Sequence, residues 1–190
     1  MQQILPIIIT ALGILVFFIT VYFIIIALFF HKEKQGQALV RTGLGGTKVA
    51  INGGIYSIPI FHQLETIDIS MKKIQIDCLS KESAISKDNL RTDVKAVFLI
   101  RVKYEVESIA KVALTIGAGK IRNTESLKDM FQAKFSEALK STIRKFEFTE
   151  LLDNRQELCN QTLILIGTDL HGFTIEDCAI DYIEKSNTNK

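Results

Sequence analysis

An uninterrupted apolar segment opens the chain, and alternation between apolar and polar positions begins only after it. No Lys, Arg, His, Asp or Glu occurs from Met1 to Phe30. As a helix, the 27 residues from Ile4 to Phe30 would extend roughly 40 Å, which exceeds the ~30 Å hydrocarbon core of a bilayer. A cleaved signal peptide would need a basic start, a shorter apolar run and a small-residue cleavage site, and this sequence does not fit those features. We therefore predict a transmembrane anchor at residues 1–31, in which Ile4 to Phe30 span the membrane.

Period-two alternation follows the anchor and gives way to helical spacing in the second half of the chain. The clearest strand is Leu90–Val102, with apolar residues on one face and charged residues on the other. A short helix is predicted around Ser108–Ile116, and an amphipathic helix from an N-terminal cap at Ser126 to Phe146. A third helix is predicted from Thr149 to Gly172, followed by a last strand, FTIEDCAIDYI. Strands segregated from helices predict an α+β fold, an antiparallel β-sheet with helices packed on one face.

The apolar positions change phase once within the segment Leu64–Ser80. Apolar side chains share one face up to Met71 and adopt the opposite phase from Ile74 onwards. A one-residue change of phase inside a strand is typical of a β-bulge. We therefore predict one strand here, with a bulge at Lys72 and Lys73.

Five glycines and one lysine lie in the segment RTGLGGTKVAINGG, which raises the question of phosphate binding. A P-loop needs its lysine directly after the last glycine and a helix beyond it. Here Lys48 follows Thr47 and precedes a β-branched run, and it also occupies the third glycine position of the dinucleotide fingerprint. Neither motif is met. We predict instead that Gly45-Gly46 and Asn52-Gly53 form tight turns of a β-meander.

The charges bear on orientation and on partners. The 23 basic and 21 acidic residues nearly balance, which gives no electrostatic reason to expect nucleic-acid binding. Basic residues follow the anchor, beginning with His31, Lys32 and Lys34, whereas only uncharged glutamines precede it. By the positive-inside rule, the N-terminus should lie outside and the body in the cytoplasm. The cysteines are three in number and scattered, which fits a reducing compartment.

A search for catalytic and metal-binding residues finds no recognisable active site. His31, His62 and His171 stand apart and are not at metal-ligand spacing with any cysteine. His171 is interpreted as a cation at a helix C-terminus. The carboxylates Glu176, Asp177 and Asp181 lie together on the last strand, where a solvated edge is the favoured interpretation over an acid–base pair. We therefore expect no enzymatic activity, no cofactor and no metal.

The segment IYSIPIFH, near the start of the body, has two possible interpretations. Ile58, Pro59, Ile60 and Phe61 could belong to a core strand in which proline marks an edge or bend. Alternatively, these four residues could dip into the cytoplasmic lipid leaflet. The sequence favours the core strand. Because only Lys32 to Gln37 separate the anchor from the body, the body is expected to lie against the bilayer surface.

Several segments of the sequence together resemble a known protein family. An apolar anchor followed by QALVRTGLGGTKVAINGGIYSIPIFHQLETIDI is similar to the bacterial flotillin-like inner-membrane proteins of the stomatin–prohibitin–flotillin superfamily (SPFH, Band 7). The segments ISKDNLRTDVKAVFLIRV, EALKSTIRKFEFTELLDNRQEL and HGFTIEDCAIDYI resemble the family's central strand, paired helices and terminal strand. The resemblance implies an SPFH/Band 7-like domain over residues 37–184 and a polar tail at 185–190.

The resemblance also implies a function. It predicts a non-catalytic scaffold that forms homo-oligomers on the cytoplasmic face of the bacterial inner membrane and organises lipid microdomains. A small membrane protein of the NfeD type is the partner it implies. Flotillin-like relatives continue into a long coiled coil, whereas no heptad repeat follows the domain here, so the chain is expected to be a fragment or a short member. A regulatory subunit docked on a membrane protease or transporter is the alternative.

Overall fold

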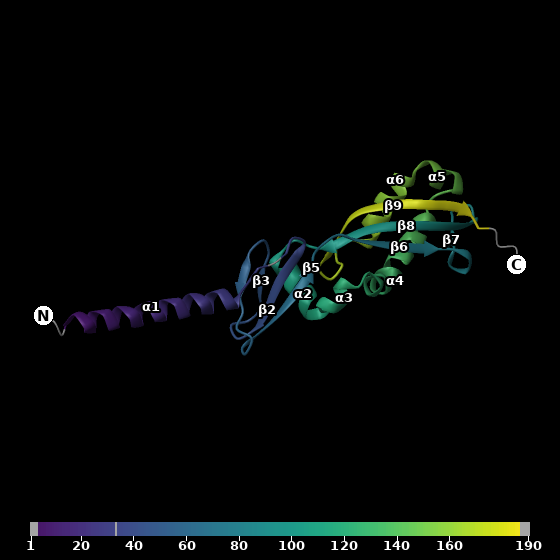
Figure 1. Ribbon diagram of the computed structural model, residues 1–190. Helices are drawn as coiled ribbons and strands as arrows, with labels where there is room; N and C mark the ends of the chain where they lie inside the picture. Colours follow the sequence, from purple (N-terminus) through teal and green to yellow (C-terminus); the bar gives the residue numbers. More distant parts are fainter. Residues whose placement is uncertain (1–3, 33, 187–190) are drawn as a thin grey trace.

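The computed structural model describes residues 4–32 and 34–186. Figure 1 shows an elongated molecule in which helix α1 (Ile4–Phe29) leads into a body of sheets and helices. Of the predicted segments, residues 1–3 of the anchor and 187–190 of the polar tail lie outside the described part. Helix α1 ends one residue before the predicted boundary, because Phe30 begins a strand. Among the described residues, it is the one helix whose length and composition would let it cross a membrane, with a mean hydropathy of 2.9 over Thr10–Phe29.

The body contains three antiparallel sheets. Strand β1 (Phe30–Lys32) pairs with β4 (Gly54–Tyr56), and β2 (Gln37–Gly43) lies between β3 (Lys48–Ala50) and β5 (His62–Asp68). In the third sheet, β8 (Arg91–Val102) is central. One edge of β8 pairs with β6 (Lys72–Cys78) and β7 (Ala84–Ile85), and its other edge pairs with β9 (Phe173–Lys185).

Helices cover one face of the third sheet, so the α+β class predicted from the sequence is confirmed. The described helices of the body are α2 (Val106–Thr115), α3 (Ala118–Arg122), α4 (Thr124–Ile143), α5 (Phe148–Asp153) and α6 (Arg155–Ile166), of which α2 and α3 contact mainly the sheet of β2, β3 and β5. Helix α4 packs on β6 and α6 packs on β9. The first half of the body, which contains β1 to β5 with α2 and α3, adjoins α1, and the second half extends away from it (Figure 1).

The core lies between the third sheet and α4, where the two predicted apolar patterns meet. Alternate residues of β8 from Val94 to Val102 are buried. The predicted stripe of α4 faces them, and the rings of Phe98 and Phe135 lie 4.7 Å apart. Phe131 stacks on Phe135 at 5.4 Å. Both side chains of the Phe98–Phe135 pair are fully buried, so this pair ties sheet to helix.

Several helix boundaries differ from the prediction. Helix α4 is capped by Asn123, whose side chain accepts a hydrogen bond from Glu125 N at 3.0 Å, so it begins before Ser126. The third predicted helix is interrupted at Asn154 and ends at Gly167. His171 therefore does not lie at a helix terminus, and its interpretation as a dipole-facing cation is wrong. It occupies the turn before β9 with φ of 54°.

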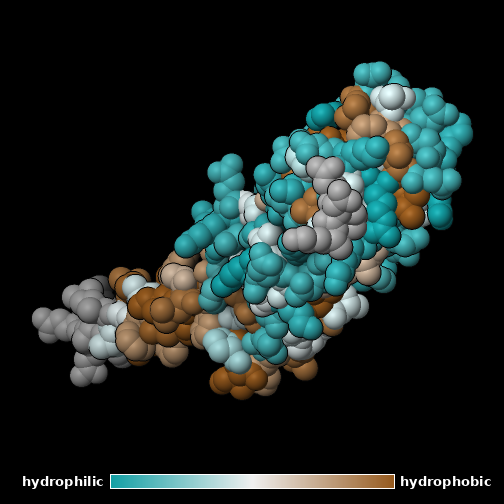
Figure 2. All heavy atoms as spheres, turned by 90° about the vertical axis from the view of Figure 1, so that its right-hand side faces the viewer, coloured by the Kyte–Doolittle hydropathy of each residue, from teal (hydrophilic) through white to brown (hydrophobic). Residues whose placement is uncertain are grey.

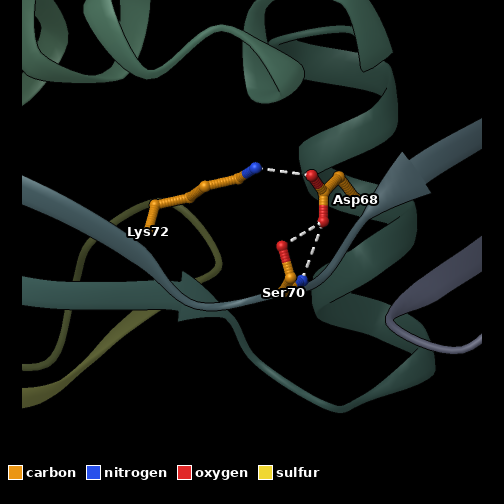
Figure 3. Close-up of polar contacts among 3 residues, drawn as sticks. All are labelled: Asp68, Ser70 and Lys72. Carbon is orange, nitrogen blue, oxygen red and sulfur yellow. Dashed lines mark hydrogen bonds and ion pairs between the residues drawn. The ribbon is translucent and has the colours of Figure 1, made fainter.

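The predicted bulge at Lys72 and Lys73 is also wrong. Strand β5 ends at Asp68 within the sheet of β2, whereas β6 begins at Lys72 within the sheet of β8. The phase of the apolar positions changes because the chain crosses from one sheet to another. At the crossing, Asp68 accepts hydrogen bonds from Ser70 and Lys72 (Figure 3).

One of the two predicted glycine turns is a hairpin and the other is not. Gly45 and Gly46, with φ of 87° and 83°, connect β2 and β3, which pair with each other. Asn52-Gly53 instead leads from β3 to β4, and β4 pairs with β1 at the end of the anchor. The chain therefore returns to the end of helix α1 at this point, which places the residues after β4 beside it.

Candidate membrane-contact site

The end of helix α1 is joined directly to the body through strands β1 and β4. Phe30 pairs with Tyr56 and Lys32 pairs with Gly54. Immediately after β4, Ser57 N donates to the carbonyl of Phe29 at 3.1 Å, and Phe29 is the last residue of the helix. The segment Ser57–Phe61 is thereby tied to the point where the apolar helix ends.

Large apolar side chains are exposed around this point. We define the apolar rim as Leu44, Tyr56, Ile58, Ile60 and Phe61. Ile60 is 86% exposed and Leu44 is 72% exposed, and the other three are also exposed. Figure 2 shows brown, hydrophobic surface over the anchor and at the base of the body beside it, whereas the rest of the visible face is mostly teal.

The exposure of the apolar rim excludes one of the two interpretations of IYSIPIFH. Residues Ile58 to Phe61 form an exposed turn between β4 and β5, so the core-strand interpretation is wrong. From this segment, Ile55 of β4 and Ser57 are buried. Pro59 lies within the exposed turn, where its missing N–H removes no ladder bond. Contact of Ile58, Pro59, Ile60 and Phe61 with lipid remains a prediction.

The side chain of His62 connects two parts of the apolar rim. Its Nδ1 accepts a hydrogen bond from Ile58 N at 3.1 Å, and its Nε2 lies 3.0 Å from the carbonyl oxygen of Leu44. A neutral imidazole with its proton on Nε2 satisfies both contacts at once. Phe61 N and His62 N also donate to the carbonyl of Ile58. One side chain therefore holds the Ile58–Phe61 turn and the Leu44 turn in a fixed relation.

Two glycines allow the backbone segments to approach each other here. A Cβ on Gly43 would lie 2.2 Å from the carbonyl oxygen of Phe61, and Gly43 has φ of 127°. A Cβ on Gly54 would lie 2.2 Å from Cζ of Phe30. The contact at Gly43 is with backbone, so this position requires glycine, whereas a side chain at Gly54 would force the ring of Phe30 to move. The glycine-rich segment thus serves close packing at the membrane end of the body.

Comparison with known proteins places the chain in a family. Residues 32–185 match the model of the SPFH domain / Band 7 family. The chain belongs to this family. It is also 35% identical, over 159 residues, to the flotillin family inner membrane protein YqiK of Escherichia coli (strain K12). The aligned region covers 83% of this chain but only 29% of that relative, so the chain spans less than a third of it.

Family membership confirms the flotillin-like resemblance drawn from the sequence. The matched region begins at Lys32, directly after the anchor, and includes the whole of the apolar rim and His62. Residues from His31 to Leu64 include four lysines and arginines but a single acidic residue, Glu33. Around the apolar rim the SPFH domain therefore combines exposed apolar side chains with positive charge, a combination that suits the surface of an anionic membrane.

Two of the three carboxylates considered as catalytic candidates make structural contacts in the SPFH domain. The carboxylate of Glu176 accepts from Arg101 Nε at 2.7 Å, and Asp177 Oδ1 accepts from the backbone N of Cys178 at 2.8 Å. The three histidines lie in separate places, and the described residues contain no cluster of His, Cys, Asp or Glu able to hold a metal ion. The cysteines are free and buried.

The sequence raised Ile58–Phe61 as an alternative lipid contact but favoured a core strand, and it did not indicate the residues that hold this turn. Nothing in the local pattern marks Leu44 or Tyr56 as exposed next to the anchor, because Leu44 stands between glycines in a turn and Tyr56 directly follows the apolar Ile55. His62 was noted only as an isolated histidine. Its role depends on contact with Leu44, eighteen positions away, and therefore on the pairing of β2 with β5.

Proposed function

We propose that this chain is a membrane-anchored, non-catalytic scaffold of the flotillin-like type. It is held in the bacterial inner membrane by α1, with its N-terminus outside and its SPFH domain in the cytoplasm. Copies associate with one another on the cytoplasmic face and organise membrane microdomains. Family membership and the inner-membrane relative support this proposal. The observation that carries it is the direct continuation of an apolar helix into a domain whose nearest surface is also apolar.

In this proposal the apolar rim rests in the cytoplasmic leaflet. Helix α1 cannot leave the bilayer, and β1 follows it without a linker. The Phe29–Ser57 hydrogen bond therefore holds Ile58, Ile60 and Phe61 close to the lipid surface. Burying exposed apolar area in lipid is favourable by roughly 25 cal/mol per Å². The basic residues around the rim add attraction to anionic headgroups.

Quenching of a unique tryptophan tests the leaflet contact, because the natural chain contains no tryptophan. The full chain with Phe61→Trp is reconstituted in vesicles that contain brominated lipids. We expect blue-shifted emission and strong quenching at position 61. The matched control is Ile164→Trp, at a 73% exposed position on α6, which should remain unquenched. Equal, water-like emission from both positions would contradict leaflet contact.

Cross-linking in native membranes tests the scaffold. A ladder of the chain with itself supports self-association, whereas one stoichiometric foreign protein supports the alternative, a regulatory subunit docked on a membrane protease or transporter. An NfeD-type protein found together with a self-ladder would identify the partner that the family resemblance implies. Orientation is tested separately by a membrane-impermeant maleimide on Lys48→Cys, which should react only after the cells are opened.

A further inference from the structure

Two flanks of opposite charge lie along the two edges of the third sheet. We call β6, α4 and the two residues after α4 the basic flank, and α5, α6 and β9 the acidic flank. They lie on opposite sides of β8, since α4 packs on β6 and α6 packs on β9 (Figure 1). The basic flank carries seven basic and four acidic residues, whereas the acidic flank carries seven acidic and two basic residues.

These charges are mostly not neutralised within the chain. Among the residues that the structure describes, the ion pairs are Asp68–Lys72, Lys87–Glu147 and Arg101–Glu176. Only Lys72 and Glu176 of these belong to the flanks. Asp181 and Glu184 of β9 and Arg144 after α4 are exposed and form no ion pair there. Each flank thus presents net charge to its surroundings.

We propose that the basic flank of one copy binds the acidic flank of the next copy on the same membrane. This inference rests on the self-association proposed above and names the surfaces involved. Copies anchored by α1 share one orientation relative to the bilayer, so neighbours meet either through like flanks or through opposite flanks. Like flanks bring together charges of the same sign, which disfavours the two-fold arrangement. Opposite flanks are complementary, and a head-to-tail contact repeats into a ring or an open arc.

The contacting groups lie at matching levels of the sheet. A hollow of about 250 Å³ on the basic flank is lined by Ala84, Lys140 and Arg144, together with Glu137 and the serines 83 and 141. Thr92 of β8 pairs with Ala84 on one side and with Lys185 on the other. The hollow and the end of β9 therefore lie at the same level of β8, and β8 runs roughly along the direction of α1 (Figure 1).

The hollow has two cations against one carboxylate, Glu137, so its net positive charge suits a carboxylate from a neighbour. Lys140 and Arg144 are one helical turn apart and face the same space, and Ser83 Oγ is buried there without a hydrogen-bond partner in the described residues. In a neighbour at equal height above the membrane, Asp181 and Glu184 occupy the corresponding level. A carboxylate from the neighbour would meet both cations and the free hydroxyl.

Strand β9 is poorly suited to pairing with a strand of another copy, which is the other common way of joining two sheets. Strand β9 is an edge strand, but its register with β8 shifts twice, so that Asp181 and Glu176 bulge out of the ladder. Bulges and charged side chains at an edge disfavour addition of another strand. Contact through side chains is therefore favoured over a continuous intermolecular sheet.

Charge reversal tests the contact in the full chain reconstituted in vesicles, with energy transfer between copies labelled at a C-terminal tag. We expect Lys140→Glu with Arg144→Glu, and separately Asp181→Lys with Glu184→Lys, to weaken self-association by about tenfold or more, because each juxtaposes like charges. All four substitutions in one chain should restore it, since the flanks become complementary again. A mixture of the two double variants should also associate. High salt should weaken the natural contact.

The matched control reverses two exposed charges on α2, Glu107→Lys and Lys111→Glu, and should leave association unchanged. Circular dichroism of every variant checks the fold, and the restored four-substitution chain separates misfolding from loss of contact. Association that is insensitive to either reversal, or not restored by the combination, would overturn the flank contact while leaving the scaffold intact. Absence of association in the natural chain would overturn both.

Discussion

Replacement of Asp68 by asparagine should loosen the junction between the two halves of the body. The Asp68 carboxylate accepts from Ser70 N at 2.9 Å, from Ser70 Oγ at 2.5 Å and from Lys72 Nζ at 2.5 Å. The side chains of Asp68 and Lys72 are each only 19% exposed, so water screens the pair weakly. These bonds join the last residue of β5 to the first residue of β6 (Figure 3).

The expected loss of stability follows from these contacts. Hydrogen bonds to a charged group contribute about 1.5–3 kcal/mol each, and asparagine keeps a neutral acceptor for Ser70 but loses the charge that holds Lys72. We therefore expect Asp68→Asn to lower the free energy of unfolding by about 1–3 kcal/mol at neutral pH. The control is Glu176→Gln, which removes an ion pair whose side chains are 38% and 33% exposed and should cost roughly 0–1 kcal/mol.

The dependence on pH provides a second, independent check. Burial alone would raise the pKa of Asp68, but the hydrogen bonds from Lys72 and Ser70 outweigh it and hold that pKa below its usual range. A lowered folded pKa stabilises the fold above the unfolded value of about 3.9, and this stability is lost as pH falls through the folded pKa. The difference between the natural chain and Asp68→Asn should therefore shrink in acid.

Urea unfolding of the full chain in detergent, followed by circular dichroism at pH 7 and pH 3, measures both effects. Two results would refute the reasoning. One is a loss for Asp68→Asn no larger than that for Glu176→Gln at pH 7. The other is a difference between Asp68→Asn and the natural chain that stays constant or grows between pH 7 and pH 3.

Three further predictions concern packing, the apolar rim and the thiols. Phe135→Ala should lower the free energy of unfolding by about 3–5 kcal/mol, measured by urea unfolding, because a fully buried ring leaves a cavity; a loss below 1 kcal/mol would contradict this packing. Gly43→Ala should destabilise the fold more than Gly45→Ala in thermal unfolding, since only the first places a Cβ against the backbone of Phe61; equal effects would contradict the close approach. Burial raises the pKa of the Cys78 thiol to about 11, so iodoacetamide at pH 8 should modify it only after denaturant is added. Rapid modification of the folded chain would show that this thiol is accessible.

Local periodicity was sufficient to predict much of this protein. A long apolar run is sufficient to predict a helix, and α1 follows the predicted range to within one residue. The alternation in β8 and the stripe of α4 are set by which side chains face the core, so the sequence pattern identified both. The α+β class followed from the order of these elements, and the flotillin-like resemblance agreed with the family match.

Pairing between distant segments was decided only by the tertiary structure. The phase change before Ile74 marks the point where the chain crosses from one sheet to another. A β-bulge would give the same pattern in the sequence, because it also shifts the alternation of apolar positions by one residue. The exposure of Ile58–Phe61 depends on the pairing of β4 with β1, and the role of His62 depends on its reach to Leu44. The opposite flanks arise because β6 and β9 lie on either side of β8. Periodicity reports which face of an element is buried, but it carries no information on which other element lies beside it.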